Sequence, residues 1–172
     1  MAGGADEVAA SLLRGAIRAN VDACVYLPDS CLTPVIRAFE RSNKITMIPC
    51  AREDEGVAIA VGLNLGGCTA VCMMEASGLG LSGLILARAQ VQRTPVVIVA
   101  SHTAGAGEPY DYHSATALLS EGVFKGLGIP YEIATQTAAL EALLCRVVET
   151  ARGQRTSFGL LIPPFVAAGA AA

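Results

Sequence analysis

The sharpest cluster of charged side chains in the sequence is Arg52-Glu53-Asp54-Glu55, directly before an apolar segment that begins at Val57. Acidic side chains in the first turn of a helix are stabilised by the helix dipole, which accounts for Asp54 and Glu55. It does not account for a tight acidic cluster between an apolar strand and an apolar helix. A carboxyl group removed from water there would keep its proton near neutral pH, as acid–base catalysis requires. The cluster therefore indicates either a helix terminus or an acid–base site.

A glycine-rich segment, Gly78-Leu79-Gly80-Leu81-Ser82-Gly83, matches the G-x-G-x-x-G pattern of dinucleotide-binding proteins. That fingerprint also needs an acidic residue at the end of the next strand, to bind a ribose hydroxyl. The next apolar run ends in Ala100-Ser101-His102, with no acid. We therefore expect these glycines to let the backbone approach some other ligand.

His113 follows a polar segment, Ser101–Tyr112, which is long enough to be a functional loop. A lone histidine can be solvated, structural or catalytic, and the spacing leaves all three open. The six cysteines form no C-x-x-C pair and do not share metal-ligand spacing with the two histidines. We therefore expect buried, reduced thiols and no metal site.

The chain has 172 residues, and its composition favours a folded protein. We expect one domain over 1–166 and a flexible tail over 167–172. Hydrophobic residues make up 53% and charged residues 16%, too apolar for a disordered chain. A net charge of −3 without a basic stripe gives nucleic-acid binding no support. No apolar run reaches the roughly 20 residues of a membrane span, and the N-terminus lacks a signal-peptide pattern. We expect a soluble, cytoplasmic protein with some apolar surface buried against a partner.

Strand and helix patterns alternate along the chain, which predicts an α/β fold: one three-layer domain with a mostly parallel sheet and helices on both faces. The expected strands are Ala23–Tyr26, Lys44–Pro49, Thr69–Met74, Pro95–Ala100, Tyr131–Ile133 and Phe158–Pro163. The expected helices cover Val8–Ile17, Leu32–Arg41, Arg52–Leu65, Leu79–Gln90, Ala115–Val123 and Leu140–Val148.

Ligands of such sheets bind at the carboxyl ends of the strands, and four polar segments are expected there. They are Leu27–Ser30, Ala51–Gly56, Glu75–Gly80 and Ser101–His113. Their side chains can converge on one crevice.

Taken in order, Tyr26–Ser30 (YLPDS), Arg52–Gly62 (REDEGVAIAVG) and Met74–Gly80 (MEASGLG) resemble a known family. The chain is similar to the pyrimidine-binding (Pyr) domain of thiamine-diphosphate-dependent 2-oxo acid decarboxylases. Within that family the resemblance points first to the alpha subunits of sulfopyruvate decarboxylases and next to phosphonopyruvate decarboxylases. It spans nearly the whole chain, from Glu7 to Pro164.

The resemblance implies a catalytic glutamate that hydrogen-bonds N1′ of the cofactor's aminopyrimidine ring and so promotes loss of the thiazolium C2 proton. Counting back nine residues from Gly62 selects Glu53 rather than Glu55 for this role. The same resemblance makes His113 a loop histidine that faces the substrate. Further positions carried over are, for the cofactor, Pro28, Ser77, Gly78 and Leu79, and for the substrate, Asp29 and Ser30.

The sequence departs from the family pattern at two positions beside the glycine-rich segment. Glu75 stands where a neutral residue is expected, and Leu81 where an asparagine is common. Both bear on the substrate more than on the cofactor. Candidates for binding an anionic substrate group are Arg52, Arg88, Arg93 and His102, and nothing in the sequence ranks them.

The family holds Mg²⁺ and the diphosphate on a separate PP domain, through G-D-G followed by Asn. None of the five aspartates here is flanked by glycines. The resemblance therefore implies a heteromer in which a PP-domain beta subunit completes the site for thiamine diphosphate and Mg²⁺. The expected reaction converts sulfopyruvate to sulfoacetaldehyde and CO2. The alternatives are a phosphonopyruvate decarboxylase or carboligase subunit, and a non-catalytic nucleotide-binding or regulatory module.

Overall fold

The computed structural model describes residues 3–103, 108 and 110–169. The strands are β1 (Ala23–Tyr26), β2 (Thr46–Pro49), β3 (Ala70–Glu75), β4 (Val97–Ser101), β5 (Tyr131–Ile133) and β6 (Phe158–Ile162). The α-helices are α1 (Gly4–Arg18), α2 (Thr33–Ser42), α3 (Glu53–Leu65), α4 (Leu79–Gln92), α5 (Ser114–Leu127), α6 (Leu140–Gln154) and α7 (Pro164–Ala167). Three short 3₁₀ helices are η1 (Ala76–Gly78), η2 (Asp111–His113) and η3 (Thr137–Ala139).

The six strands form one sheet in the order β2-β1-β3-β4-β6-β5, and every neighbouring pair is parallel. The predicted α/β class is confirmed, with a fully parallel sheet. The central strands β3 and β4 are almost completely buried, which is why they are continuous apolar runs rather than alternating ones. A parallel sheet places the carboxyl ends of all its strands at one edge.

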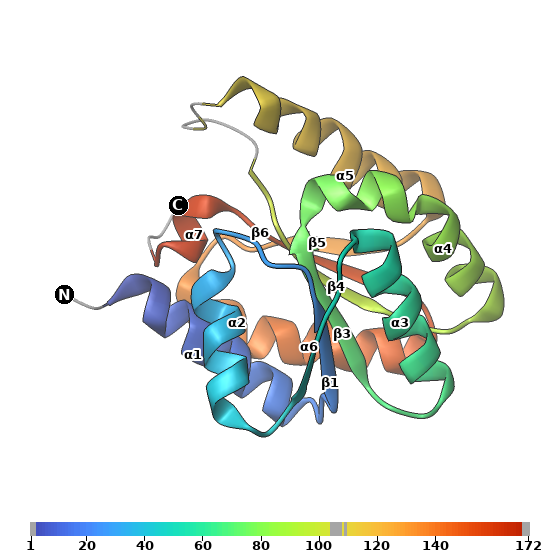
Figure 1. The fold of residues 1–172 in the computed structure, drawn as a ribbon, viewed down its shortest axis with the longest axis horizontal. Helices are drawn as coiled ribbons and strands as arrows, with labels where there is room; N and C mark the ends of the chain where they lie inside the picture. The colour runs from blue at the N-terminus through green and yellow to red at the C-terminus, as the bar shows by residue number, and fades with distance from the viewer. Residues whose placement is uncertain (1–2, 104–107, 109, 170–172) are drawn as a thin grey trace.

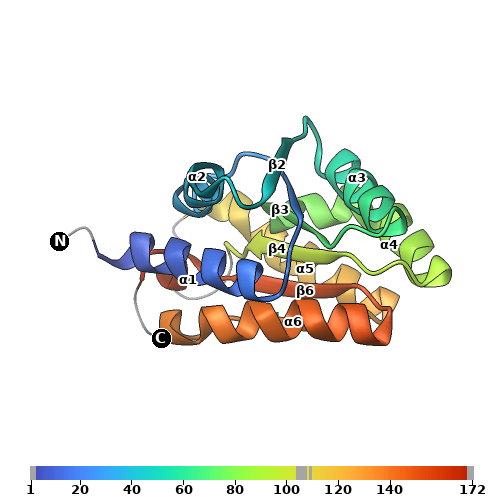
Figure 2. The same cartoon turned by 90° about the horizontal axis from the view of Figure 1, so that it is seen from below.

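Helices cover both faces of the sheet (Figures 1 and 2). Side chains of α1, α2 and α6 form a core cluster with one face, around Leu12, Phe39 and Leu144. Side chains of α3, α4 and α5 form the second cluster on the other face, around Val57, Leu86 and Phe124. Figure 2 shows α1 and α6 running side by side along the sheet. The described helices include none long and apolar enough to cross a bilayer.

Some helix ends differ from the sequence expectation. We expected a helix to end at Val123, whereas α5 continues to Leu127 and is capped by Gly128 with φ 64°, a conformation that glycine adopts without strain. At the C-terminus, residues 164–167 form α7, in which Val166 and Ala167 are buried. Of the tail expected at 167–172, residues 170–172 lie outside the described residues.

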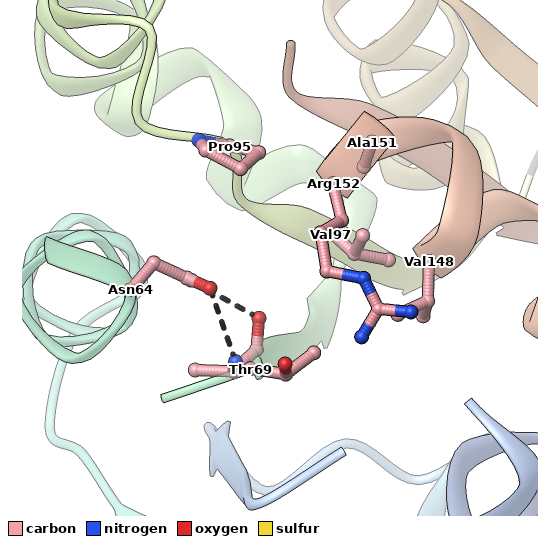
Figure 3. A pocket seen from close by; sticks show the side chains of 8 residues that line it. Asn64, Thr69, Pro95, Val97, Val148, Ala151 and Arg152 are labelled. Atoms are coloured by element: carbon pink, nitrogen blue, oxygen red, sulfur yellow. Dashed lines mark hydrogen bonds between the residues drawn. The ribbon is translucent and has the colours of Figure 1, made fainter. Parts of the chain in front are cut away.

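A small pocket lies at the amino-terminal edge of the sheet, opposite the loops that carry the candidate residues (Figure 3). Its lining comes from the starts of β3 and β4, the end of α3 and the second half of α6. Asn64 donates to the carbonyl of Ala70 and accepts from its amide, at 3.3 and 3.2 Å, so α3 is tied to the start of β3. The pocket therefore belongs to the joint between helix and strand and not to the candidate site.

Gly159 in β6 offers a test of packing in this fold. A Cβ there would lie 2.5 Å from the ring of Phe124 and 2.9 Å from Cβ of Tyr131. We expect Gly159→Ala to lower the free energy of unfolding by about 1–3 kcal/mol, because overpacking forces the ring to move. Gly153→Ala is the control: a Cβ at that position in α6 meets nothing within 4 Å, so stability should rise by roughly 0.5–1 kcal/mol. Urea unfolding measures both, and equal effects would contradict the packing.

Candidate functional site

The four polar segments follow four strands that are neighbours in the sheet, β2, β1, β3 and β4. The chain passes from β1 outward to β2 and then returns to β3 on the other side of β1, so the order reverses between β1 and β3. Crevices at such reversals are where open parallel sheets bind ligands. The loop after β1 and the segment 75–80 after β3 flank this point.

The three acids at the start of α3 differ in their hydrogen bonds. Asp54 pairs with Arg52 through two contacts of 3.0 Å, from Nε to Oδ1 and from Nη2 to Oδ2. The Arg52 guanidinium lowers the pKa of Asp54 below its usual value. Glu55 Oε2 accepts the Ala51 amide at 2.9 Å and so satisfies a donor just before the helix. Glu53 makes no hydrogen bond or ion pair with any residue that the structure describes, so its carboxyl group remains available to a ligand.

Gly78 in η1 lies directly against the side chain of Glu53. A Cβ on Gly78 would come within 2.6 Å of Glu53 Cβ and 2.7 Å of Cδ, and closer still to Cγ. Glycine is therefore required at residue 78 for Glu53 to occupy its position. The segment after β3 and the first residue of α3 thus meet, as the sequence predicted for one crevice.

Gly56 allows a second close approach, one turn into α3. A Cβ at Gly56 would lie 2.8 Å from Cys50 Sγ and 3.3 Å from Cys72 Sγ. Burial raises the pKa of the Cys72 thiol, and the carboxylate of Glu53 raises it further. The start of α3 is therefore packed tightly over β1 and β3, beside Cys50 that follows β2. All six cysteine thiols of the chain are unpaired.

In the loop after β1, Asp29 has a structural role. Its Oδ1 accepts the Leu32 amide at 2.8 Å, and its carbonyl oxygen accepts Thr33 Oγ1 at 2.8 Å, so it shapes the turn that begins α2. Pro28 and Ser30 on either side of it are exposed. The structure thus places the loop as expected but uses one oxygen of Asp29 for the fold.

The cysteine in this loop shows that three loops approach one another. Burial is the main cause that raises the pKa of the Cys31 thiol. The carboxylates of Asp29 after β1, of Glu108 after β4 and of Glu75 at the end of β3 raise it further, against a hydrogen bond with Ser30 that lowers it. Their charges act on the same group because the loops converge at one edge of the sheet.

His113 is half-buried at the end of η2, on the same edge. Its Nδ1 lies 3.0 Å from Glu108 Oε1, and its ring meets Tyr112 and Tyr110 edge-on at centroid distances of 4.3 and 5.5 Å. The Tyr110 amide is the main cause that lowers the pKa of Glu108, with His113 contributing. Neither Glu108 nor the two tyrosines was singled out from the sequence. Residues 104–107 and 109 of the expected loop lie outside the described residues.

Glu75, noted in the sequence only as a departure, is the most connected acid of the site. Its Oε2 accepts Ser77 Oγ, and its Oε1 accepts Thr116 Oγ1 at 2.9 Å and Thr103 Oγ1 at 3.2 Å. These partners come from η1, α5 and the segment after β4. Leu79, the last of the expected cofactor residues, is fully buried.

The four cation candidates are not brought together. Arg88 and Arg93 lie in the last turns of α4 and just beyond it, toward the amino-terminal edge of the sheet, and Arg52 is engaged by Asp54. His102 is 5% exposed, with Nδ1 3.3 Å from Ser120 Oγ and Nε2 3.8 Å from Glu121 Oε1. Within the described part of the chain, no three His, Cys, Asp or Glu residues are grouped as a metal site would need.

Comparisons with known proteins agree on one family. Residues 6–119 match the family of thiamine pyrophosphate enzymes, in the part described as the N-terminal TPP binding domain. The chain is 28% identical over 114 residues to sulfopyruvate decarboxylase subunit alpha of Methanothermobacter thermautotrophicus, over 66% of this chain and 69% of that protein. It is 26% identical over 122 residues to the same subunit of Methanococcus maripaludis, over 70% of this chain and 73% of that protein.

A solved structure, 2-oxoglutarate:ferredoxin oxidoreductase from Magnetococcus marinus, superposes with a TM-score of 0.74 at 13% identity. The match covers 96% of this chain and 29% of that one. At this identity the likeness concerns the fold.

The buried position of His102 predicts a pH dependence of stability. Burial lowers its pKa below 6.5, and the charges of Glu121 and Glu75 oppose the shift only in part. The unfolded chain then binds a proton at a higher pH than the folded chain does, so stability falls as the pH drops below about 6.5. We expect His102→Asn to flatten this fall, by at most about 1.4 kcal/mol per pH unit. Urea unfolding between pH 5 and 8 measures it, and parallel curves for both proteins would contradict the assignment.

Proposed function

Because residues 6–119 match its profile, the chain belongs to the thiamine pyrophosphate enzyme family as an N-terminal TPP binding domain, and we propose that it is the Pyr subunit of a thiamine-diphosphate-dependent 2-oxo acid decarboxylase. The observation that carries this proposal is the placement of Glu53. Its carboxyl group stands at the first residue of α3, against Gly78 and without a hydrogen-bonding partner among the described residues.

The residues around Glu53 fit an aminopyrimidine ring. The neighbouring acids are engaged, Asp54 by Arg52 and Glu55 by Ala51, so Glu53 alone offers its carboxyl group to a ring nitrogen. Glu53 would hydrogen-bond N1′ of that ring and share a proton with it. The backbone of Ser77, Gly78 and Leu79 would border the same ring. Bound thiamine diphosphate would supply the electron sink for the electrons released with CO2.

The loops after β1 and β4 would form the substrate side. Pro28 and Ser30 are exposed at the rim, and His113 is held beside Glu108 at the start of α5. His113 is placed to orient the substrate or to give it a proton. Asp29 would act through the turn that it stabilises, with its second carboxylate oxygen directed to the substrate side.

A second chain would complete the site. The diphosphate and Mg²⁺ motif is absent from the sequence, so we propose a PP-domain beta subunit that supplies it. The relatives are themselves named subunit alpha. Exposed apolar side chains near the site support a partner: Leu81 and Leu84, in the first two turns of α4, are 58% and 66% exposed. An apolar surface of this kind is typical of one that another chain covers.

The proposed substrate is sulfopyruvate, which carries a carboxylate and a sulfonate. In the four loops of this chain the basic side chains are Arg52, His102 and His113, and all three are already paired or buried. The partner subunit would therefore supply cationic contacts to one of the two acidic groups. Phosphonopyruvate is the alternative, since it places a phosphonate where sulfopyruvate has a sulfonate.

Replacing Glu53 tests the proposed chemistry. Glu53→Gln is nearly isosteric, so folding and assembly should survive, but the amide cannot share a proton with N1′. We expect the assembled enzyme to lose about 10²–10⁴-fold in turnover, the usual contribution of general acid–base catalysis. Exchange of the cofactor C2 proton, followed by NMR, should slow in parallel.

Glu55→Gln is the matched control, because Glu55 serves the backbone of Ala51. Its C2-proton exchange should stay near that of the wild type. Slow exchange in Glu55→Gln with normal exchange in Glu53→Gln would assign the role to the other acid, and normal exchange in both would refute the mechanism.

Reconstitution tests the two-chain arrangement and the substrate. Alone, the chain should bind thiamine diphosphate weakly or not at all, because it lacks the diphosphate motif; calorimetry with and without Mg²⁺ measures this. With a PP-domain subunit present, CO2 release should be faster from sulfopyruvate than from phosphonopyruvate or pyruvate. Tight Mg²⁺-dependent binding to the isolated chain would refute the two-chain arrangement. Faster CO2 release from another 2-oxo acid would refute sulfopyruvate as the substrate.

A further inference from the structure

The first half of α5 is held in place by polar side chains. Among its described residues from 114 to 122, the buried ones are Thr116 and Ser120, whereas Leu118 is 80% exposed. The next position on the same helix face, Phe124, is the first buried apolar side chain. Hydrogen bonds from these buried hydroxyls therefore help to fix the first two turns of this helix, beside the Leu119 side chain that lies over Gly80.

Glu75 accepts the hydrogen bonds at the first of these turns. Thr116 Oγ1 and Thr103 Oγ1 both donate to its Oε1, and the two hydroxyl oxygens are themselves 3.4 Å apart. The threonines are 2% and 4% exposed, so water cannot replace this acceptor. A carboxylate offers only acceptors and thus matches several hydroxyl donors. One side chain therefore joins the end of β3, the segment after β4 and α5.

The other carboxylate oxygen of Glu75 connects this joint to the cofactor side of the site. Oε2 accepts Ser77 Oγ, next to Gly78, which lies against Glu53. On the opposite side, α5 begins at Ser114, immediately after His113. The distance between His113 and the Ser77-Gly78 segment therefore depends on Glu75.

We propose that Glu75 is a positioning residue, which sets His113 relative to the Ser77-Gly78 segment by holding the first turn of α5. The proposal rests on the proposed function, because it assigns His113 to the substrate side. Glutamine should replace Glu75 adequately: its carbonyl oxygen can accept both threonine hydroxyls, and its amide nitrogen can donate to Ser77 Oγ. Leucine has a similar size and can do neither.

Hydrogen exchange of the full chain tests the placement directly. In Glu75→Leu we expect amides of residues 111–121 to exchange about tenfold faster, the factor implied by losing one or two ordinary hydrogen bonds. Amides of α3 and α6 should be unchanged, Glu75→Gln should restore protection, and Ser77→Ala should leave α5 as in the wild type. Thr116→Val removes one donor and leaves Glu75 in place, so it should also speed exchange in residues 111–121. This variant serves as the test if Glu75→Leu does not fold. Wild-type exchange in residues 111–121, or faster exchange spread evenly over the chain, would overturn the proposal.

Kinetics of the assembled enzyme test the consequence. Glu75→Leu should lower kcat, and the double variant Glu75→Leu/His113→Ala should be no slower than His113→Ala, because both changes act through one group. Glu75→Gln should recover most of the rate. Independent, multiplicative losses would overturn the proposal. If the assembled enzyme releases no CO2 from any 2-oxo acid, the proposed function fails, whereas hydrogen exchange still decides whether Glu75 places His113.

Discussion

The contact between the Glu53 side chain and the backbone of Gly78 constrains the whole candidate site. Any Cβ on residue 78 would overlap the glutamate, so the segment after β3 and the start of α3 can meet only with glycine there. Gly56 extends the constraint one turn further, because it lets α3 approach Cys50 and Cys72 on the sheet. The carboxyl group is thereby held at the edge of the crevice while the acids beside it are used by the fold. The Glu53 carboxyl group is free for a ligand because Arg52 pairs with Asp54 and the Ala51 amide with Glu55.

The parallel sheet makes this contact possible. Four of its six strands, β2, β1, β3 and β4, are neighbours, and their carboxyl ends place loops from residues 27 to 113 at one edge. The same topology separates functions in space. The carboxyl-terminal edge carries nearly all the acids of the site, whereas the pocket at the other edge joins α3 to β3 through Asn64. In the proposed enzyme, a second chain would cover the exposed leucines at the start of α4.

The candidate site carries more acidic than basic side chains, which is the opposite of what an anionic substrate needs. Asp29, Glu53, Glu75 and Glu108 lie at this edge of the sheet, and Arg52 and His113 already face carboxylates. Hydroxyl groups, backbone amides and His113 satisfy the carboxylates of Asp29, Glu75 and Glu108 within the chain. In the proposed enzyme, the partner would supply the positive charges that bind the substrate and the diphosphate, and this chain would supply mainly acidic groups.

The sequence by itself determined the α/β class, the positions of nearly every strand and the grouping of four loops, because continuous apolar runs and alternating helix patterns are local signals. The family resemblance added the choice of Glu53, through its spacing from Gly62; a Cβ at Gly62 meets nothing within 4 Å, and Gly78 is the glycine in contact with Glu53. Only the tertiary structure decided which acids are engaged. The roles of Glu55 toward Ala51, Asp29 toward Leu32 and Glu75 toward Thr116 depend on hydrogen-bond geometry. The link from Glu75 to Thr116 joins residues 41 positions apart, and no local pattern predicts such a pairing, because folding alone brings the two groups together.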